Sequence, residues 1–283
     1  MGSEFKYKLS IAAIMKYEQP YVLEWVAYHH CIGINHFYIY DNDTDSGMDK
    51  ILAKYIDEGI VTLIPAPGNV MMFKCYNECI SNYKNESKYI AFIDADEFLV
   101  PIEDVNVADL VDEMIKYFSD IDPRVAGLAV KWAVYGSGNH KSRPDGLMIE
   151  SYLYKENGEQ DRHVKSIVNP RQVNRFYNPH FASYNHNCYC VTEKGERISG
   201  PFLKTNDRSK IRINHYYYKS EEEFLNRIRR GKCDIRVTEE QMKEKIDAEL
   251  PKLRSSNNEY DDLMLRYVSR VKEEMSRFQA GSF

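Results

Sequence analysis

The N-terminal third of the chain alternates between short apolar runs and longer, more polar stretches. The apolar runs lie at 8–15, 36–40, 60–64 and 89–93, and their β-branched and aromatic residues are typical of buried strands. The stretches between them, at 21–32, 48–58 and 72–84, are predicted to be helices; in the first, apolar residues recur every three to four positions. Each connection is long enough for a crossover helix, so we predict an α/β fold with a parallel sheet covered on both faces.

The remaining sequence continues this pattern and then becomes richer in charged helices. Further helices are expected at 104–117, near 146–153 and at 260–278, and further strands at 125–135 and 211–218. The basic run at 227–232 is explained equally well as a helix C-terminus that complements the helix dipole or as a phosphate clamp. The last helix mixes charges of both signs, which favours packing on the rest of the chain or on a second subunit over contact with a membrane surface.

Three carboxylates follow the fourth predicted strand directly. Asp94, Asp96 and Glu97 come after the apolar run at 89–93, and the C-terminal ends of parallel strands are where open α/β folds bind ligands. Asp94 and Asp96 are two positions apart, so their side chains point the same way on an extended backbone. Such oxygen ligands suit Mg²⁺ or Mn²⁺ shared with substrate phosphates. A solvated acidic turn is the alternative that this spacing alone leaves open.

Composition narrows the classes of function. Lys and Arg number 38 against 43 Asp and Glu, a formal net charge of −5 with no long basic block, which argues against nucleic acid as a partner. No apolar run reaches the roughly 18 residues that a membrane span requires. The six cysteines form no zinc pattern, and free thiols suit a reducing cytosol. The chain has neither a GxGxxG nor a GxxxxGK[ST] loop, which argues against a Rossmann-type dinucleotide site and against a P-loop nucleotide site.

Several separated motifs, in a fixed order, resemble glycosyltransferase family 92 and related family-2-like proteins. The main ones are Lys16-x-Glu18-x-Pro20-x-x-Leu23-Glu24-Trp25 with His29, Gly33-x-x-His36-Phe37-Tyr38-x-Tyr40-Asp41-Asn42-Asp43, and Phe92-Ile93-Asp94-Ala95-Asp96-Glu97-Phe98. The resemblance covers 7–101 well. It continues more thinly through Trp132-x-x-Tyr135-Gly136-Ser137, Gly146-Leu147-x-Ile149-Glu150, Lys165-Ser166-Ile167 and His215-Tyr216-x-x-Lys219-Ser220-x-x-Glu223-Phe224.

The resemblance implies a GT-A-like fold, a nucleotide-sugar donor and a metal bound by an Asp-x-Asp motif. The catalytic domain would span 6–235, with a nucleotide-sugar half at 6–101 and an acceptor half at 102–235. A helical C-terminal extension would follow at 236–283. Asp94 and Asp96 would hold Mn²⁺ or Mg²⁺, and the resemblance makes His215 a third metal ligand or a diphosphate contact.

Five other residues are candidates for the donor side. Asp41 and Asp43 follow the second predicted strand, where a carboxylate can accept hydrogen bonds from a base or from ribose hydroxyls. Glu18 belongs to the first family motif. Lys165 would neutralise a donor phosphate or form a simple ion pair, and Lys219 would bind the leaving diphosphate.

The acceptor side is expected around the loop that begins at Gly136. Trp132 and Tyr135 precede it and could stack on a sugar face, although such aromatic residues also serve as core. His180 is a further acceptor candidate whose alternative is a buried, hydrogen-bonded histidine. Glu97 would either touch the acceptor or shape the turn after the metal motif.

An inverting transferase needs a base to deprotonate the acceptor hydroxyl. Glu150 and Asp145 are the two candidates, and the family motif favours Glu150 because it lies inside the matching segment. Their alternative roles are a helix cap and a surface charge. A retaining enzyme would need no such base.

The sequence therefore predicts a metal-dependent glycosyltransferase, with a UDP-sugar as the expected donor and UDP-galactose as one candidate. The acceptor would be a saccharide or glycolipid in surface polysaccharide or glycan synthesis. A nucleotidyltransferase and a non-catalytic sugar- or nucleotide-binding module are the alternatives. We expect a cytoplasmic protein, with attachment to the inner face of a membrane and a homodimer through the C-terminal helices as further expectations.

Overall fold

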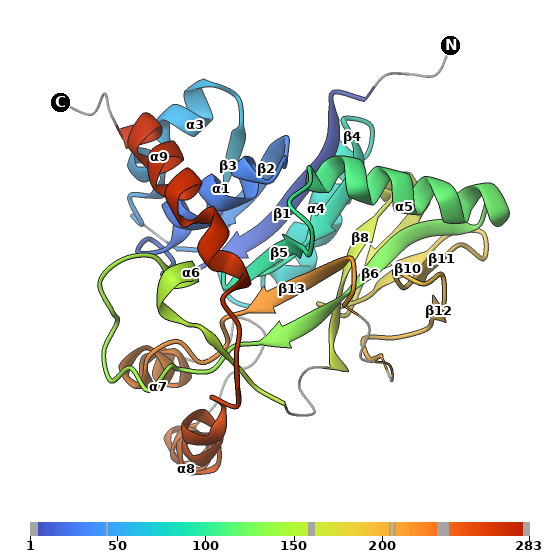
Figure 1. Ribbon diagram of the computed structural model, residues 1–283. Helices are drawn as coiled ribbons and strands as arrows, with labels where there is room; N and C mark the ends of the chain where they lie inside the picture. The colour runs from blue at the N-terminus through green and yellow to red at the C-terminus, as the bar shows by residue number, and fades with distance from the viewer. Residues whose placement is uncertain are drawn as a thin grey trace.

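The computed structural model describes residues 5–43, 45–157, 162–203, 205, 208–230 and 238–279. It confirms the predicted α/β class, with a large central sheet and helices on both of its faces (Figure 1). The predicted domain boundary between residues 235 and 236 lies outside the described residues.

The central sheet has the strand order β12-β11-β6-β8-β4-β1-β2-β3, and β13 pairs with both β6 and β5. The strands are β1 (Tyr7–Met15), β2 (His36–Asp41), β3 (Val61–Pro65), β4 (Ser87–Phe92), β5 (Glu97–Pro101), β6 (Val125–Val134), β8 (Val164–Val168), β11 (Tyr189–Val191), β12 (Arg197–Ile198) and β13 (Ile211–His215). Strands β5, β8 and β12 run against the common direction of the others. The parallel order β3-β2-β1-β4 agrees with the alternating pattern of the N-terminal third.

The remaining elements cover the sheet or connect its strands. The α-helices are α1 (Val22–Cys31), α2 (Met48–Ile51), α3 (Ala53–Asp57), α4 (Met72–Tyr83), α5 (Val107–Ile121), α6 (Met148–Ser151), α7 (Glu221–Arg230), α8 (Glu239–Ser255) and α9 (Val268–Gln279). The 3₁₀ turns are η2 (Pro170–Gln172) and η3 (Leu263–Tyr267), and the two small antiparallel pairs join β9 (Val173–Phe176) to β10 (Ala182–Tyr184) and β7 (Tyr154–Lys155) to β14 (Glu259–Tyr260).

Strand β1 shows why the sheet is buried on both faces. Its successive side chains point to opposite sides, and all of those from Leu9 to Met15 are buried. Ile11 and Ala13 join the core beneath α1 and α5, whereas Ala12 and Ile14 join the core beneath α4. A strand with two covered faces is expected to be mostly apolar, which is the pattern here, and the buried hydroxyl of Ser10 is satisfied by Ser87.

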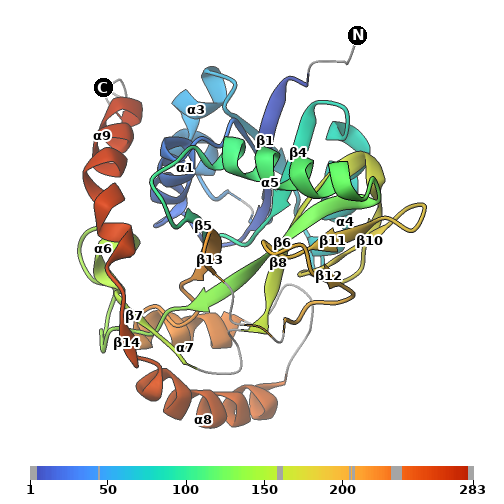
Figure 2. The same ribbon diagram turned by 45° about the vertical axis from the view of Figure 1, so that its right-hand side comes forward.

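The parallel strands bring several chemically active segments to one edge of the sheet. The residues after β1, β2 and β4 lie at that edge, as does the end of β13, because these strands share a direction. Helices α7 and α8 lie beyond the arrowheads of β6 and β13 (Figure 2). A site at this edge can therefore draw on both halves of the chain.

The last helix packs on its own chain, which is one of the two partners predicted for it. The ring of Phe278 stacks on Tyr55 of α3 with centroids 3.6 Å apart, and Glu274 pairs with His30 of α1. Lys272 forms an ion pair of 2.8 Å with Glu150 of α6. These contacts hold α9 beside α1 and α3 (Figure 1).

Three predicted helices are shorter than their sequence pattern indicates. The one expected at 260–278 begins as α9 only at Val268, after β14 and η3. The helix expected at 48–58 divides at Leu52, which lies between α2 and α3 with φ −101° and ψ 8°. The side chain of Leu52 is fully buried. The helix expected near 146–153 is the single turn α6. Within the described ranges, no helix has the length and apolar character that crossing a membrane demands.

Candidate active site

A pocket of about 300 Å³ opens at the C-terminal edge of the parallel strands. Met15 of β1 and Asn42 after β2 line one part of it, and Asp94 and Asp96 after β4 line the centre. Trp132 of β6, His215 of β13 and residues of α7 and α8 close the other part. The pocket therefore lies where the sequence places the Asp-x-Asp motif, and it contains residues from both predicted halves.

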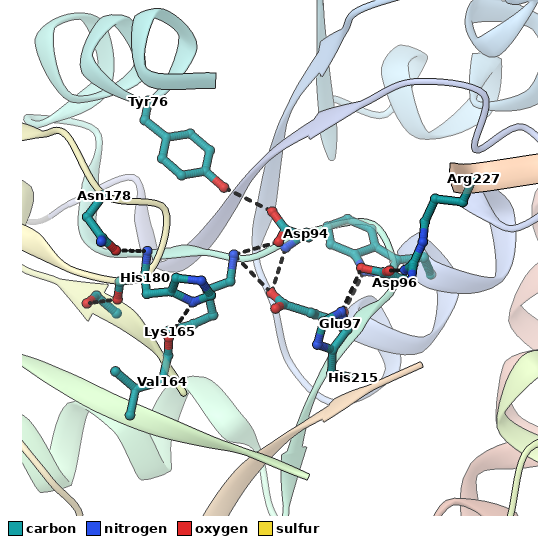
Figure 3. A network of polar contacts seen from close by, with 12 residues as sticks. Tyr76, Asp94, Asp96, Glu97, Val164, Lys165, Asn178, His180, His215 and Arg227 are labelled. Carbon is teal, nitrogen blue, oxygen red and sulfur yellow. Dashed lines mark hydrogen bonds and ion pairs between the residues drawn. The ribbon is translucent and has the colours of Figure 1, made fainter. Parts of the chain in front are cut away.

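Asp94 is held by a lysine and a tyrosine rather than facing the pocket alone (Figure 3). The ammonium of Lys165 lies 2.7 Å from its Oδ2, and the hydroxyl of Tyr76 donates to its Oδ1 at 3.3 Å. Lys165 comes from β8 and is fully buried. Burial by itself lowers the pKa of Lys165, but Asp94 and Glu97 outweigh that effect and raise it, so the side chain stays charged.

Glu97 braces the turn that carries the two aspartates. Its Oε2 accepts the backbone N–H of Asp94 at 2.8 Å, and its own backbone N–H donates to the carbonyl of Asp94 at 3.1 Å. Lys165 lies 3.4 Å from the same Oε2. Burial raises the pKa of Glu97 well above its usual range. Of the two roles predicted for Glu97, these contacts favour shaping the turn.

Asp96 lies between the imidazole of His215 and the guanidinium of Arg227. The Nε2 of His215 is 3.5 Å from its Oδ1, and a guanidinium nitrogen of Arg227 is 3.6 Å from its Oδ2 (Figure 3). Burial raises the pKa of Asp96, but His215, Lys219 and Arg227 outweigh it and hold the pKa below its usual range. Asp96 is therefore an ionised carboxylate at neutral pH.

The side-chain oxygen of Asp96 and the ring nitrogen of His215 could together bind a divalent cation that is also bound by a substrate. Oδ1 of Asp96 and Nε2 of His215 are close enough to contact one ion at the usual ligand distances of about 2.0–2.2 Å. The described residues contain no group of three or more His, Cys, Asp or Glu side chains that could hold a metal. Mg²⁺ commonly binds through one or two carboxylates plus phosphates and water, so two protein ligands suffice. Asp94 is less available than predicted, because Lys165 neutralises it.

The predicted donor-side residues divide into two groups. Glu18 lines the pocket and pairs with Lys219 at 3.1 Å. Asp41 and Asp43 lie at the expected strand end, but the described lining contains Asn42 in their place. Asp41 instead accepts hydrogen bonds from the hydroxyl of Ser46 and the backbone N–H of Asp43, which shapes the loop.

On the acceptor side, Trp132 and His180 line the pocket and Tyr135 does not appear in its described lining. The indole of Trp132 packs against His215, with centroids 4.2 Å apart, and against His180 at 4.9 Å. Burial and the charge of Lys165 lower the pKa of His180 to about 2. The neutral ring donates from Nδ1 to the carbonyl of Val164 at 3.1 Å, which leaves Nε2 as an acceptor.

Tyr135 has a structural role in this conformation. Its ring is fully buried, and its hydroxyl bonds to Arg212 at 3.0 Å and to Asn214 at 3.2 Å on β13. The core explanation that the sequence left open therefore accounts for it.

The two predicted bases lie away from this pocket. Glu150 caps α6 by accepting the backbone N–H of Leu147 at 2.8 Å, and its other oxygen pairs with Lys272 of α9. Asp145 is on an exposed loop. Neither belongs to the described lining of the pocket.

Sequence reasoning did not assign Asn42, Tyr76 or Arg227 to the site. Asn42 sits within a family motif, which is a signal for it, and its amide donates to the carbonyls of Ala66 and Gly68. Tyr76 lies on the helix before β4 and offered no local signal. Arg227 belongs to the basic run at 227–232, of which 231–232 lie outside the described residues.

Comparison with known proteins identifies the family of this chain. The glycosyltransferase family 92 profile matches residues 6–258. A glycosyltransferase family 92 protein of Ricinus communis is 26% identical over 175 residues, which cover 62% of this chain and 31% of that protein. The beta-1,4-galactosyltransferase galt-1 of Caenorhabditis elegans is 25% identical over 262 residues, covering 87% of this chain and 55% of galt-1.

Among solved structures, S. aureus TarS 1-349 aligns with 97% of this chain and 73% of its own, at 10% identity and a TM-score of 0.38. That likeness is too low to decide anything further about the site. The chain spans about a third of the first of these relatives and about half of galt-1. Because the family profile covers most of its residues, the protein belongs to glycosyltransferase family 92.

Proposed function

We propose that this protein is a metal-dependent glycosyltransferase that moves a sugar from a nucleotide-sugar donor to a hydroxyl of a saccharide or glycolipid acceptor. The observation that carries the proposal is the meeting of Asp96 and His215 in one pocket at the C-terminal edge of the sheet, in a member of family 92. Open α/β sheets bind nucleotides at such an edge.

The donor half of the pocket has features that suit a nucleoside diphosphate. Met15 and Asn42 line the pocket near the ends of β1 and β2. Lys219 and Arg227 bring positive charge to the side of Asp96 where a diphosphate would lie. The name of galt-1 supports UDP-galactose as the first donor to examine.

The leaving nucleoside diphosphate needs its developing charge stabilised. A divalent ion held by Asp96 and His215, Mn²⁺ or Mg²⁺, would act as a Lewis acid on the diphosphate oxygens. Glu97 and Lys165 hold the Asp94–Asp96 turn in place, so the carboxylate of Asp96 does not have to reorganise when substrate binds. Lys219 is positioned by Glu18 and adopts a left-handed backbone with φ 51°, which is uncommon outside glycine.

The acceptor would lie against Trp132 and His180. Trp132 lines the pocket although His163 and His215 cover most of its ring, and Nε2 of His180 can accept a hydrogen bond from a sugar hydroxyl. Direct displacement with inversion remains the proposed course. Glu150 and Asp145 are the bases predicted from sequence, but neither belongs to the described lining of the pocket, and the next prediction tests Glu150.

We expect Glu150→Gln to leave the transfer rate within about twofold of wild type, whereas loss of a general base costs about a hundredfold or more. The reason is that both oxygens of Glu150 serve α6 and α9 in this conformation. The rate is measured as nucleotide released in the presence of acceptor. Lys272→Gln breaks the same ion pair from the other side. A hundredfold loss in Glu150→Gln alone would restore Glu150 as the base.

A screen of nucleotide sugars, read out by the nucleotide released, tests the function directly. The proposal predicts release of a nucleoside diphosphate from one donor class, with Mn²⁺ or Mg²⁺ required. Release of pyrophosphate from a sugar phosphate and a nucleoside triphosphate would indicate a nucleotidyltransferase instead. Binding without turnover of any donor would indicate a binding module. Homodimerisation through the C-terminal helices and membrane association stay predictions.

A further inference from the structure

We propose that Arg227 alternates between Asp96 and the donor diphosphate, and that this exchange couples nucleotide binding to metal binding. The inference rests on the proposed function, because it concerns the same pocket. It goes beyond that function by giving a residue of α7 a role in the order in which the two ligands bind.

The contact between Arg227 and Asp96 is the starting point. The guanidinium nitrogen of Arg227 is 3.6 Å from Oδ2 of Asp96, and His215 is 3.5 Å from Oδ1 (Figure 3). Before any ligand is bound, Oδ2 of Asp96 thus faces the positive charge of Arg227 and Oδ1 faces the imidazole of His215. A divalent ion at Asp96 would meet the charge of Arg227 at close range, and like charges at such a distance repel.

The hold of Asp96 on Arg227 is loose enough to be exchanged. A separation of 3.6 Å is too long for a direct hydrogen bond, so the pair is an ion pair without the short contacts of a bidentate arrangement. A quarter of the Arg227 side chain is exposed, at 25%, compared with 17% for Asp96. Moving the guanidinium therefore breaks no buried hydrogen bond to Asp96.

Two aromatic rings contact the guanidinium of Arg227, and a separate set of hydrogen bonds anchors its helix. Its guanidinium lies over the ring of Tyr217 at 3.9 Å and near Phe224 at 5.4 Å. Helix α7 is anchored by Glu223, which accepts hydrogen bonds from the hydroxyls of Tyr21 and Tyr152. Helix α7 is therefore held by contacts that do not involve Arg227, and a turn of the guanidinium has to keep or replace its contact with Tyr217.

Arg227 also lies at the junction of two pockets. The pocket of about 300 Å³ shares Glu18, Asp96, Tyr217 and Arg227 with a neighbouring pocket of about 340 Å³. The guanidinium can turn from Asp96 toward either space. A diphosphate offers it several oxygens, and the planar fork of arginine matches phosphate geometry better than a single distant carboxylate oxygen does.

These contacts define a coupling between two ligands. Diphosphate would attract Arg227 away from Asp96 and free that carboxylate for the metal, and the metal would in turn release Arg227 for the diphosphate. Thermodynamic linkage requires the two effects to be equal. Removing the charge of Arg227 should then change the two separate affinities in opposite directions.

The test measures binding of Mn²⁺ alone, and of UDP alone in EDTA, by isothermal titration calorimetry on the full chain. We expect Arg227→Gln to bind Mn²⁺ about five- to tenfold more tightly than wild type and UDP about tenfold more weakly. Arg227→Lys keeps the charge but lacks the planar fork of the guanidinium. Its affinities for Mn²⁺ and UDP should lie between those of wild type and those of Arg227→Gln. Arg229→Gln is the matched control, because Arg229 is exposed on the same helix and its guanidinium donates to Asn226, away from the pocket lining.

Affinities that both stay unchanged, or that both fall together in Arg227→Gln and Arg227→Lys, would overturn the inference. A parallel loss would mean that Arg227 merely supports α7, and thermal unfolding of each variant shows whether α7 has been disturbed. If wild type binds neither UDP nor Mn²⁺, alone or together, the proposed function fails and the role of Arg227 fails with it. If wild type binds both and the variants match it, only the role of Arg227 fails.

Discussion

Asp96→Asn is expected to lower kcat/KM for sugar transfer by about a thousandfold and to abolish its dependence on Mn²⁺ or Mg²⁺. The substitution keeps the size of the side chain but removes the charge that the metal requires. His215 would remain as a single neutral ligand, which is too weak to hold the ion against water. Transfer is measured by nucleotide release across a range of metal concentrations.

Two observations separate this catalytic loss from damage to the fold. Asp120→Asn, at an exposed carboxylate that pairs with Lys116 on the same helix, is the control and should match wild type. The melting temperature of Asp96→Asn should remain close to that of wild type, because its neighbours Arg227 and His215 keep other packing contacts. Full metal-dependent transfer in Asp96→Asn would show that the metal is bound elsewhere.

Lys165→Met is expected to destabilise the protein by about 3–5 kcal/mol, because it leaves buried charge without its partner. Lys165 and Glu97 are both fully buried, and Asp94 is paired with the same ammonium. Oε1 of Glu97 already has no hydrogen-bond partner among the described residues. The free energy of unfolding, measured in urea, gives the loss directly.

The stability loss in Lys165→Met should depend on pH, and a second substitution at Glu97 should restore part of it. Burial raises the pKa of Glu97 above the 4.5 of an exposed glutamate, so the fold favours protonated Glu97. The stability that protonation of Glu97 contributes is fully present below pH 4.5 and is lost as the pH rises through the pKa of the folded state. The loss of unfolding free energy in Lys165→Met should therefore become smaller as the pH is lowered toward 4.5. Adding Glu97→Gln should recover part of the loss at pH 7. A variant as stable as wild type at pH 7 would contradict the assigned charges.

Local pattern was sufficient for the parallel direction of the N-terminal strands and for the place of the Asp-x-Asp motif. The apolar runs of β1, β2, β3 and β4 and the crossover lengths between them determine a parallel sheet. That sheet puts the end of β4 at a ligand-binding edge, so Asp94 and Asp96 could be located from sequence. His215 needed the family resemblance, because 119 positions separate it from Asp96 and no periodicity links them.

The roles of other residues depend on contacts that no local pattern encodes. Glu150 is engaged by Lys272, which is 122 positions away on a helix whose docking site the sequence does not specify. Asp94 is neutralised by Lys165 from β8, 71 positions later. Arg227 sits in a basic run that is equally consistent with a solvated helix end, and only the packing of α7 turns it toward Asp96.

The central claim is that the pocket binds a nucleoside diphosphate together with a divalent metal at Asp96 and His215. Calorimetric titration of the wild-type chain with UDP, once with Mn²⁺ and once with EDTA, tests it most directly. The account predicts that UDP binds at least about tenfold more tightly with Mn²⁺, and that His215→Ala removes most of this difference. Equal affinity for UDP in Mn²⁺ and in EDTA would contradict it.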